Sequence, residues 1–204
     1  MKVELWTSAA SIAEMERNAA LAALTCRGNA DKEHVPSEVL TRIIKAGHES
    51  VLEHINLTYS VKGLSRACLQ ELARHRHISL SVESTRHTLS KNLERPDWVE
   101  HAAEGIEHPV FQASFRASVD LLKAIIKRSP ETPNDELKYF LPEMWPTNLV
   151  LTSNVRELRH ILKLRTAPAA LKEFRELARA MYEAVPEEYK YLLKDCVYEE
   201  TDHE

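Results

Sequence analysis

Arg74 to His87 reads RHRHISLSVESTRH, and this stretch gathers three arginines, three histidines and four hydroxyl side chains. Each guanidinium offers a planar fork of donors that stays charged at any working pH, so it can bind a phosphate or carboxylate bidentately. The interleaved hydroxyls can complete the hydrogen bonds of the same oxyanion. The mixture therefore predicts a binding site for an anionic ligand.

A basic, serine-rich run is also typical of a solvated surface turn, and composition alone favours that interpretation. The flanking sequence argues for a site. Leu64 to Arg74 is predicted to be a helix with an apolar face, and Thr85 to Leu89 has the composition of a β-strand. A charged run that is held between two ordered elements is a better candidate for a site than one in a flexible linker.

Three sequence blocks resemble those of a single family. Arg74-His75-Arg76 is followed, after seven residues, by Ser84. The block HESVLEH lies upstream at residues 48–54, and downstream lie Asn154-x-Arg156-x-Leu158 and Leu164-Arg165. In this order the blocks resemble the signature of the flavin-dependent thymidylate synthases (the ThyX family). Their joint occurrence, over about residues 48 to 165, is far more specific than any one of them.

The resemblance implies a function and an assembly. Members of this family convert dUMP to dTMP by reductive methylation, with methylenetetrahydrofolate as the carbon donor. FAD, reduced by NADPH or NADH, is the source of the hydride. The resemblance further implies a homotetramer with sites built at subunit interfaces, and small molecules, with no nucleic acid and no membrane, as its partners.

The resemblance also implies site residues, position by position. Arg165 is expected to be catalytic and to lie against the uracil ring. The residues expected to bind FAD are Ser50, Arg74, His75, Arg76, Asn154, Arg156 and His160. The residues expected to bind dUMP, besides Arg165, are Glu71 and Arg74 near the pyrimidine and Ser84, Thr85, Arg86 and Lys138 at the phosphate. Positions matching His48, Ser50 and Glu53 line the flavin and nucleotide cavity of the family.

The chain departs from the family pattern at several of these positions. The family has Asn-Glu where this chain has Ser81-Val82, so the polar contact of that Glu to flavin is lost or shifts to Glu83. His87 replaces a tyrosine. Lys138 stands where the family usually has an arginine, and lysine supplies the charge without the bidentate fork.

The helix predicted from Asn154 to Leu164 is informative without the family. Asn154 and Glu157 form a capping box at its start. Its apolar stripe is Val155, Leu158, Ile161 and Leu162, and its basic stripe is Arg156, Arg159, His160 and Lys163. Arg165 falls on the continuation of the apolar stripe, so its guanidinium needs an acceptor. That acceptor is either a structural carboxylate or, as the resemblance implies, the substrate.

Cysteine usage agrees with the flavin-dependent route. Thymidylate synthases that lack flavin activate uracil by adding a cysteine to C6. Here Cys26 ends a helix, Cys68 lies on an apolar helical face and Cys196 is near the C-terminus, so none is predicted in the arginine-rich site. Three widely spaced cysteines without a CxxC motif also predict a reduced, cytoplasmic protein.

Length and composition bound the architecture. The length of 204 residues fits one domain, or one domain with an insertion, and a single domain over 1–204 is predicted. The net charge of −4 argues against a general nucleic-acid binder. The four glycines form neither GxGxxG nor a P-loop, and no apolar run is long enough to span a membrane. The first six residues are predicted to be a strand and not a signal peptide.

Hydrophobic periodicity predicts an α+β fold with an antiparallel sheet flanked by helices. Strands are predicted at 1–6, 55–61 and 148–152, and helices at 11–25, 36–46, 64–74, 109–128, 135–141, 154–164 and 168–185, with 93–107 as a loop.

Two other functions remain open from the residues alone. A metal hydrolase could use His75 and His77 with His48, His54 or Glu53, although the neighbouring arginines would repel a metal ion. A non-catalytic nucleotide- or RNA-binding module could use the basic run, although that run has no interleaved aromatic residues.

Overall fold

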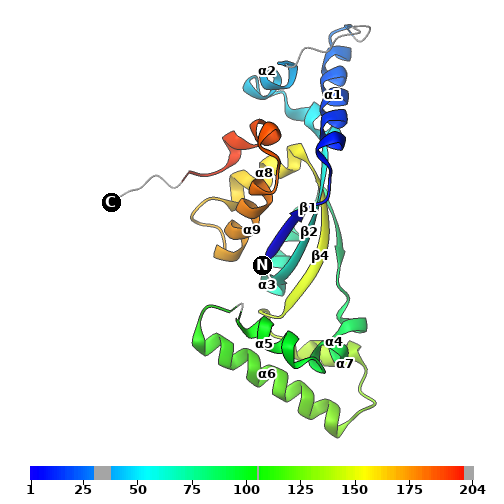
Figure 1. The fold of residues 1–204 in the computed structure, drawn as a ribbon, viewed down its shortest axis with the longest axis vertical. Coiled ribbons are helices and arrows are strands. Elements are labelled where there is room, and N and C mark those ends of the chain that lie inside the picture. Colours follow the sequence, from blue (N-terminus) through cyan, green and yellow to red (C-terminus); the bar gives the residue numbers. More distant parts are fainter. Residues whose placement is uncertain (30–37, 105, 200–204) are drawn as a thin grey trace, which may run out of the picture. The chain divides into compact units, whose positions relative to one another are not determined.

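A computed structural model of the protein describes residues 1–29, 38–104 and 106–199. Four strands, β1 (Lys2–Leu5), β2 (Asn56–Ser65), β3 (Ile78–Val82) and β4 (Pro146–Asn154), form one antiparallel sheet in the order β1-β2-β4-β3 (Figure 1). Helices accompany the sheet, so the predicted α+β class is confirmed.

The register of the two central strands is visible in their cross-strand contacts. The hydroxyls of Thr58 and Thr152 lie 2.9 Å apart, and the backbone N–H of Val155 donates to the carbonyl of Ile55 at 2.8 Å. Leu57, Tyr59 and Val61 of β2 are buried, as the alternation in the sequence predicted.

The described chain divides into two compact units. The first unit comprises Met1, Lys62–Gln70 and Ser81–Leu149, and the second comprises Lys2–Val61, Glu71–Leu80 and the chain from Val150 onward. The bounds of β2, β3, β4 and of helix α3 (Arg66–Leu72) include residues of both units. The single domain over 1–204 stays a prediction.

Helices build the first unit around an aromatic core. They are α4 (Thr85–Leu93), α5 (Pro96–Glu104), α6 (Pro109–Arg128), α7 (Asn134–Leu137) and the 3₁₀ helix η2 (Lys138–Phe140). The ring of Trp145 lies 5.7 Å from that of Phe115 and 5.0 Å from that of Trp98, centroid to centroid. The predicted helix over 109–128 is confirmed, with Phe115, Val119 and Leu122 inward.

Two predictions in this unit were wrong. Residues 85–89 were predicted as a strand and are the first turns of α4, and 93–107, predicted as a loop, contains α5. In α4, Leu89 and Leu93 are both buried and stand four residues apart, and in α5 the same holds for Val99 and Ala103. Packing of these short apolar stripes outweighs the β-propensity and polarity of the local sequence.

A short helix near Asn134 also differs from expectation. Asn134 was predicted to cap a helix from Asp135 to Leu141. The structure has a four-residue α7 that begins at Asn134 and continues as η2. The Asn134 side chain instead donates to the backbone carbonyl of Arg86 and accepts from Ser90, so it joins α7 to α4.

The second unit holds the remaining helices. They are α1 (Ala9–Thr25), α2 (Val39–Lys45), η1 (Glu49–His54), α8 (Val155–Arg165), α9 (Lys172–Glu183), η3 (Glu187–Leu192) and η4 (Lys194–Cys196). Pro36 and Ser37, predicted to begin the second helix, lie outside the described residues. Figure 1 shows α8 and α9 side by side, and both bury the apolar positions predicted for them except Leu171, which precedes α9 and is exposed.

Arg159 was predicted on the basic stripe of α8, opposite the apolar one, but its side chain is buried and only 1% exposed. Its guanidinium donates to Asp195 at 2.6 and 2.7 Å, to Glu49 at 3.0 and 3.1 Å, and to the carbonyl of Leu192 at 2.6 Å. Burial lowers the pKa of Arg159, but the hydrogen bonds to Asp195 and Glu49 outweigh it and raise the pKa above the ordinary value. The free-energy cost of burying this cation is offset, because its donors are satisfied by acceptors.

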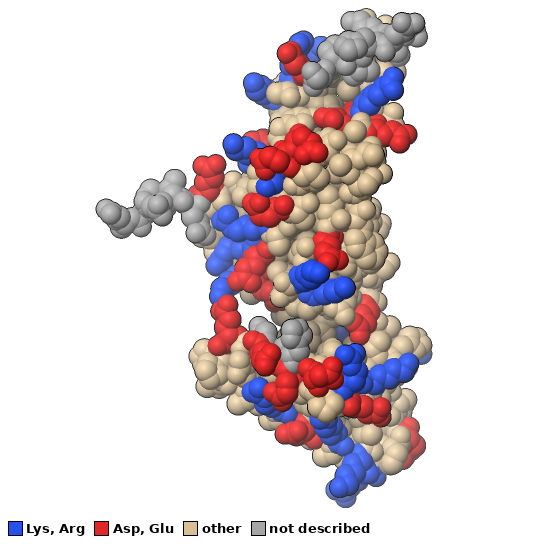
Figure 2. All heavy atoms as spheres, in the orientation of Figure 1, with Lys and Arg blue, Asp and Glu red and all other residues tan. Residues whose placement is uncertain are grey.

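Charges of both signs are interspersed on the face that Figure 2 shows. Several form exposed pairs, among them Arg116 with Glu100 and Arg95 with Asp97. Among the described residues, none of the helices has the length and apolar character that a membrane crossing requires.

Candidate active site

His75 and Arg165 meet in the second unit because two helix ends bring them together. After α3, the N–H of Arg74 donates to the carbonyl of Glu71 and that of His75 to Leu72, which turns the chain and buries His75. Arg165 is the last residue of α8, a position at which the helix dipole favours a cation.

Three contacts hold the Arg165 guanidinium. Its Nε donates to Nε2 of His75 at 3.1 Å and its Nη1 donates to Oε2 of Glu71 at 3.0 Å, while Cζ lies 4.6 Å from the ring centroid of Phe174. The acceptor that the sequence required is therefore a carboxylate of the same chain. The side chain keeps 19% of its surface exposed, so a ligand can still reach it.

His75 is held from its other side by Glu157. Its Nδ1 lies 3.2 Å from Oε1 of Glu157, and both residues are buried. Burial lowers the pKa of His75 below its ordinary value, and the charge of Arg165 adds to this effect, against the opposing influence of Glu157. The imidazole is therefore neutral at neutral pH, which leaves Nε2 free to accept from Arg165.

His160 completes this cluster. Its ring meets that of His75 edge-on, with centroids 5.9 Å apart. His75, Glu157 and His160 each offer a ligand atom, and these atoms lie within 4.8 Å of one another. Of the residues considered for a metal hydrolase, only His75 belongs to this group. The guanidinium of Arg165 donates to His75 beside it, and a cation in that place disfavours a metal ion.

The two arginines that flank His75 point outward. Arg74 is 3.7 Å from Glu71 and its side chain is 75% exposed, and Arg76 is also exposed. The motif therefore alternates one buried histidine with two guanidiniums that are accessible to a ligand.

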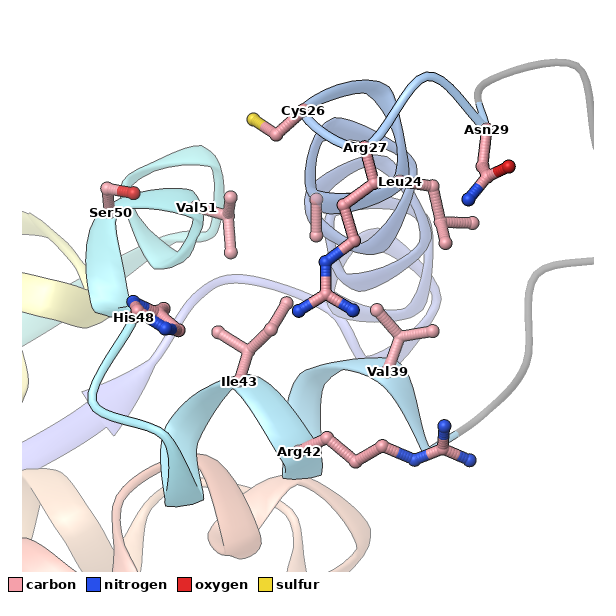
Figure 3. Close-up of a pocket in the computed structure, with 11 residues that line it drawn as sticks. Leu24, Cys26, Arg27, Asn29, Val39, Arg42, Ile43, His48, Ser50 and Val51 are labelled. Atoms are coloured by element: carbon pink, nitrogen blue, oxygen red, sulfur yellow. The ribbon is translucent and has the colours of Figure 1, made fainter.

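A cavity of about 530 Å³ lies in the second unit, between the end of α1, α2 and the start of η1. Leu24, Val39, Ile43 and Val51 give it apolar walls. Figure 3 shows Arg27 with its guanidinium between these helices, and His48 and Ser50 on the opposite side. An apolar slot with cationic side chains suits a flavin, whose ring system is flat and apolar and whose diphosphate is anionic.

Cys26 also lines this cavity, next to Arg27 and in the same pocket as Arg42. The sequence placed Cys26 at the end of a helix, which is confirmed. The cavity that it lines contains none of the residues of the arginine-rich run from Arg74 to His87. Cys68 and Cys196 are buried, and burial raises the pKa of the Cys196 thiol to about 11.

Asn154 and Arg156, predicted to bind FAD, begin α8. The Oδ1 of Asn154 accepts from the N–H of Glu157 at 2.8 Å, which confirms the predicted cap. Arg156 pairs with Glu53 at 2.5 Å, and both side chains are half exposed. Glu53 therefore has a local partner and does not line the cavity that His48 and Ser50 share.

The residues predicted to bind the phosphate of dUMP lie in the first unit. Ser84 precedes α4, and Thr85 and Arg86 form its first turn, while Lys138 begins η2, which contacts α4. The Nε of Arg86 lies 2.8 Å from Oδ1 of Asp135, and this exposed pair lacks the alignment of a hydrogen bond. The free N–H groups and positive dipole end of α4 are suited to an anion.

Glu83 is the residue to which the flavin contact of the family was expected to shift. Its side chain is engaged by other residues of the first unit. Its carboxylate accepts from Asn148 at 2.5 Å and from Asn92 at 3.2 Å, and its backbone N–H donates to the carbonyl of Asn148. Val82 beside it is exposed.

Sequence reasoning missed the roles of Glu157 and Arg159. Glu157 was seen only as part of a capping box. Arg159 stands four residues after Val155 and three before Leu162, which is the spacing of the buried stripe, so the signal was present in the sequence.

Comparisons with known proteins show the family of this chain. A family model described as "Thymidylate synthase complementing protein" matches residues 8–189. The flavin-dependent thymidylate synthase of Campylobacter jejuni (strain RM1221) is 39% identical over 186 residues, which cover 87% of this chain and 86% of that protein. The flavin-dependent thymidylate synthase of Wolinella succinogenes is 40% identical over 164 residues, which cover 76% and 78% of the two chains.

The fold is also similar to a solved structure. The crystal structure of Thymidylate Synthase X from Helicobacter pylori, with FAD and dUMP, superposes with a TM-score of 0.82 at 32% sequence identity. The match covers 98% of this chain and all, 100%, of that one.

Proposed function

Because this chain belongs to the family of flavin-dependent thymidylate synthases, we propose that it binds FAD and dUMP and converts dUMP to dTMP. In the proposed reaction methylenetetrahydrofolate supplies the carbon and leaves as tetrahydrofolate, and NADPH supplies the reducing equivalents. Bound flavin supplies the hydride chemistry.

The observation that carries the proposal is the held guanidinium of Arg165. For uracil C5 to attack a one-carbon unit, negative charge must develop on the ring nitrogen and oxygens. A cation already oriented by His75, Glu71 and Phe174 can stabilise that charge without reorganising, because its plane is set before substrate binds. Glu71 is positioned beside the same guanidinium and is proposed to contact the pyrimidine.

The phosphate of dUMP is proposed to bind in the first unit. The hydroxyls of Ser84 and Thr85, the guanidinium of Arg86 and the ammonium of Lys138 supply donors and charge near the start of α4. Asp135 now pairs with Arg86, so phosphate binding exchanges one anionic partner for another.

The flavin is proposed to bind where exposed cations and the cavity can hold it. Arg74, His75 and Arg76 form one set of contacts, Asn154, Arg156 and His160 a second, and Ser50 with the cavity wall a third. The apolar wall suits the ring system, and Arg27 lies across the cavity from His48.

We further propose that the protein is a homotetramer with sites at its subunit interfaces. The two predicted groups of substrate residues lie in different units of the chain, and the exposure of Arg74 and Arg76 leaves them available to a second copy. A cytoplasmic location is proposed as well, and the wide spacing of the three cysteines in the sequence, without a CxxC motif, supports it.

The first test is spectroscopic. The purified protein is mixed with FAD, gel-filtered, and followed anaerobically with NADPH, with and without dUMP. We expect retained flavin that bleaches with NADPH, and dTMP when methylenetetrahydrofolate is added. A protein that retains no flavin under any of these conditions would contradict the proposal.

Arg165→Ala tests the assigned role. We expect this variant to retain flavin and to lose about 10²- to 10³-fold in kcat, which is the cost of removing one preorganised charge-stabilising group. Asp120→Asn, an exposed substitution on α6 outside the proposed site, is the control and should keep wild-type turnover. Full turnover in Arg165→Ala, or an equal loss in Asp120→Asn, would refute the role assigned to Arg165.

A further inference from the structure

Glu157 occupies a position that its cap role does not explain. Its backbone N–H is already bound by Asn154, which fixes the residue at the first turn of α8. In a capping box the glutamate carboxylate reaches back to the first residue of the motif. Here that carboxylate is buried and lies 3.2 Å from Nδ1 of His75, which is 82 residues away in the sequence.

The partners of His75 permit only one tautomer. An ionised carboxylate only accepts hydrogen bonds, so Nδ1 of His75 carries the proton that faces Glu157. The Nε–H of Arg165 only donates, so Nε2 of His75 must be the acceptor in the 3.1 Å contact. Glu157 cannot donate and Arg165 cannot accept, so together they fix the tautomer of the imidazole.

The fixed tautomer of His75 helps to set the plane of the Arg165 guanidinium. His75 holds Nε, Glu71 holds Nη1 at 3.0 Å, and Phe174 lies against the flat face at 4.6 Å. Two edge contacts and one face contact leave the plane little freedom, whereas Glu71 and Phe174 alone would let it pivot.

We propose that Glu157 is a positioning residue for thymidylate synthesis: it fixes the His75 tautomer that orients Arg165 toward the pyrimidine. This inference rests on the proposed function, because Arg165 acts on the pyrimidine only if that function holds. Glu157 acts through His75 and contacts no substrate.

The contact between His75 and Arg165 is expected to depend on pH, because charged groups surround His75. Glu157, His160 and Arg165 of α8 face the ring, Glu71 follows behind Arg165, and α9 contributes the uncharged ring of Phe174. Protonation of His75 places an Nε2–H against the Nε–H of Arg165, which breaks the contact. Activity is therefore expected to fall as pH drops through the lowered pKa of His75.

The test compares Glu157→Gln and Glu157→Met with wild type and with Asp120→Asn, an exposed control on α6. Protein labelled with ¹⁵N-histidine reports the ring tautomer of His75, which His75→Asn assigns. In wild type we expect one tautomer with the proton on Nδ1. Glutamine can donate or accept, and methionine can do neither, so in both variants only Arg165 still favours the proton on Nδ1. If Glu157 is what fixes the tautomer, both variants should populate the Nε2–H tautomer in part, with loss of the contact to Arg165.

Kinetics provides the second readout. We expect kcat to fall about tenfold or more in both variants, since misorientation of a catalytic group is costly, while the Kd for dUMP changes by less than about threefold. In Glu157→Gln the acid limb of the pH profile should move to lower pH, because a carboxylate that raises the pKa of His75 is gone. Asp120→Asn should match wild type throughout.

Two results would overturn the proposal. One is an unchanged His75 tautomer in both variants, and the other is a kcat and acid limb that match wild type although the tautomer changes. A glutamate with a structural role alone would lower thermal stability without moving the acid limb. If wild type makes no dTMP, the proposed function fails, and the histidine spectra still decide the link between Glu157 and His75.

Discussion

Arg165 is a cation that the protein keeps paired before any ligand arrives. An unpaired guanidinium on the buried side of a helix is costly, and Glu71 and His75 remove that cost. In the proposed function, substrate would meet a guanidinium that is already oriented and already shares its charge. Binding would then use the donors that remain, which favours a ligand whose negative charge grows during the reaction over one that is simply anionic.

Lys138 offers a prediction at the same scale. Lysine supplies a point charge, whereas arginine can bind two phosphate oxygens at once. Lys138→Arg is expected to lower the Kd for dUMP about three- to tenfold, equivalent to about 1 kcal/mol, with kcat unchanged. Isothermal titration with dUMP measures this change.

Deoxyuridine, which has no phosphate, is the control ligand. Its affinity should be the same in wild type and Lys138→Arg. An equal gain for both ligands would show that residue 138 acts on something other than the phosphate.

At the scale of elements, polar side chains of α8 make two sets of contacts. Glu157 and Arg165 contact His75, which the proposed function places in the site. Arg159 ties α8 to η1 through Glu49, to the end of η3 through Leu192 and to η4 through Asp195. An apolar stripe alone would pack α8 but would not fix its rotation as sharply, because apolar contacts are non-directional.

Arg159→Met tests this anchor. Methionine fills a similar volume but removes the cation from Asp195 and leaves Glu49 only the more distant Lys163, at 3.7 Å. We expect the free energy of unfolding to fall by about 2–3 kcal/mol, toward the low end for a broken buried pair because Asp195 is half exposed. Urea denaturation at one fixed protein concentration measures the change.

The exposed pair of Arg116 and Glu100 provides the control. Arg116→Met is expected to lower the free energy of unfolding much less than Arg159→Met does, because exposed ion pairs contribute little to stability. Equal effects of the two substitutions would mean that burial of Arg159 contributes nothing beyond a surface pair.

Elements with a clear hydrophobic periodicity could be predicted from the sequence. Short, polar elements could not. The stripe over 109–128 and the cap of α8 by Asn154 followed from spacing and capping chemistry. Residues 85–93 were not predictable as a helix, because only Leu89 and Leu93 are buried and the aromatic core that selects them comes from distant segments. The hydrogen-bond partners of Arg165 and Arg159 were not predictable either, since they lie 33 to 110 residues away in the sequence.

For the whole molecule, the arrangement of the site residues suggests a test of assembly. Within a single chain, Arg165 contacts both Glu71 and His75, and all three residues belong to the second unit. Arg86 and Lys138 belong to the first unit. If sites form at subunit interfaces, one chain can supply Arg165 and another Arg86.

We therefore expect Arg165→Ala and Arg86→Ala chains to complement each other when co-expressed. Random mixing gives each site both intact residues in about one case in four, so activity should recover to about a quarter of wild type. Arg165→Ala mixed with Glu71→Ala is the control, because those residues act within one chain and no mixed site regains both. Recovery in neither mixture would contradict the interface proposal.

The anchor of Arg159 also sets an order of events during biosynthesis. Glu49 leaves the ribosome 110 residues before Arg159, but Asp195 follows it by 36 residues. At about 5–20 residues per second, α8 exists for about 2–7 s before its second carboxylate is made. During that time Glu49 is the only one of the two carboxylates that can neutralise the Arg159 cation. A nascent chain therefore lacks part of the contacts that fix α8. We expect the proposed site at Arg165 to reach its final geometry only after translation has passed Asp195.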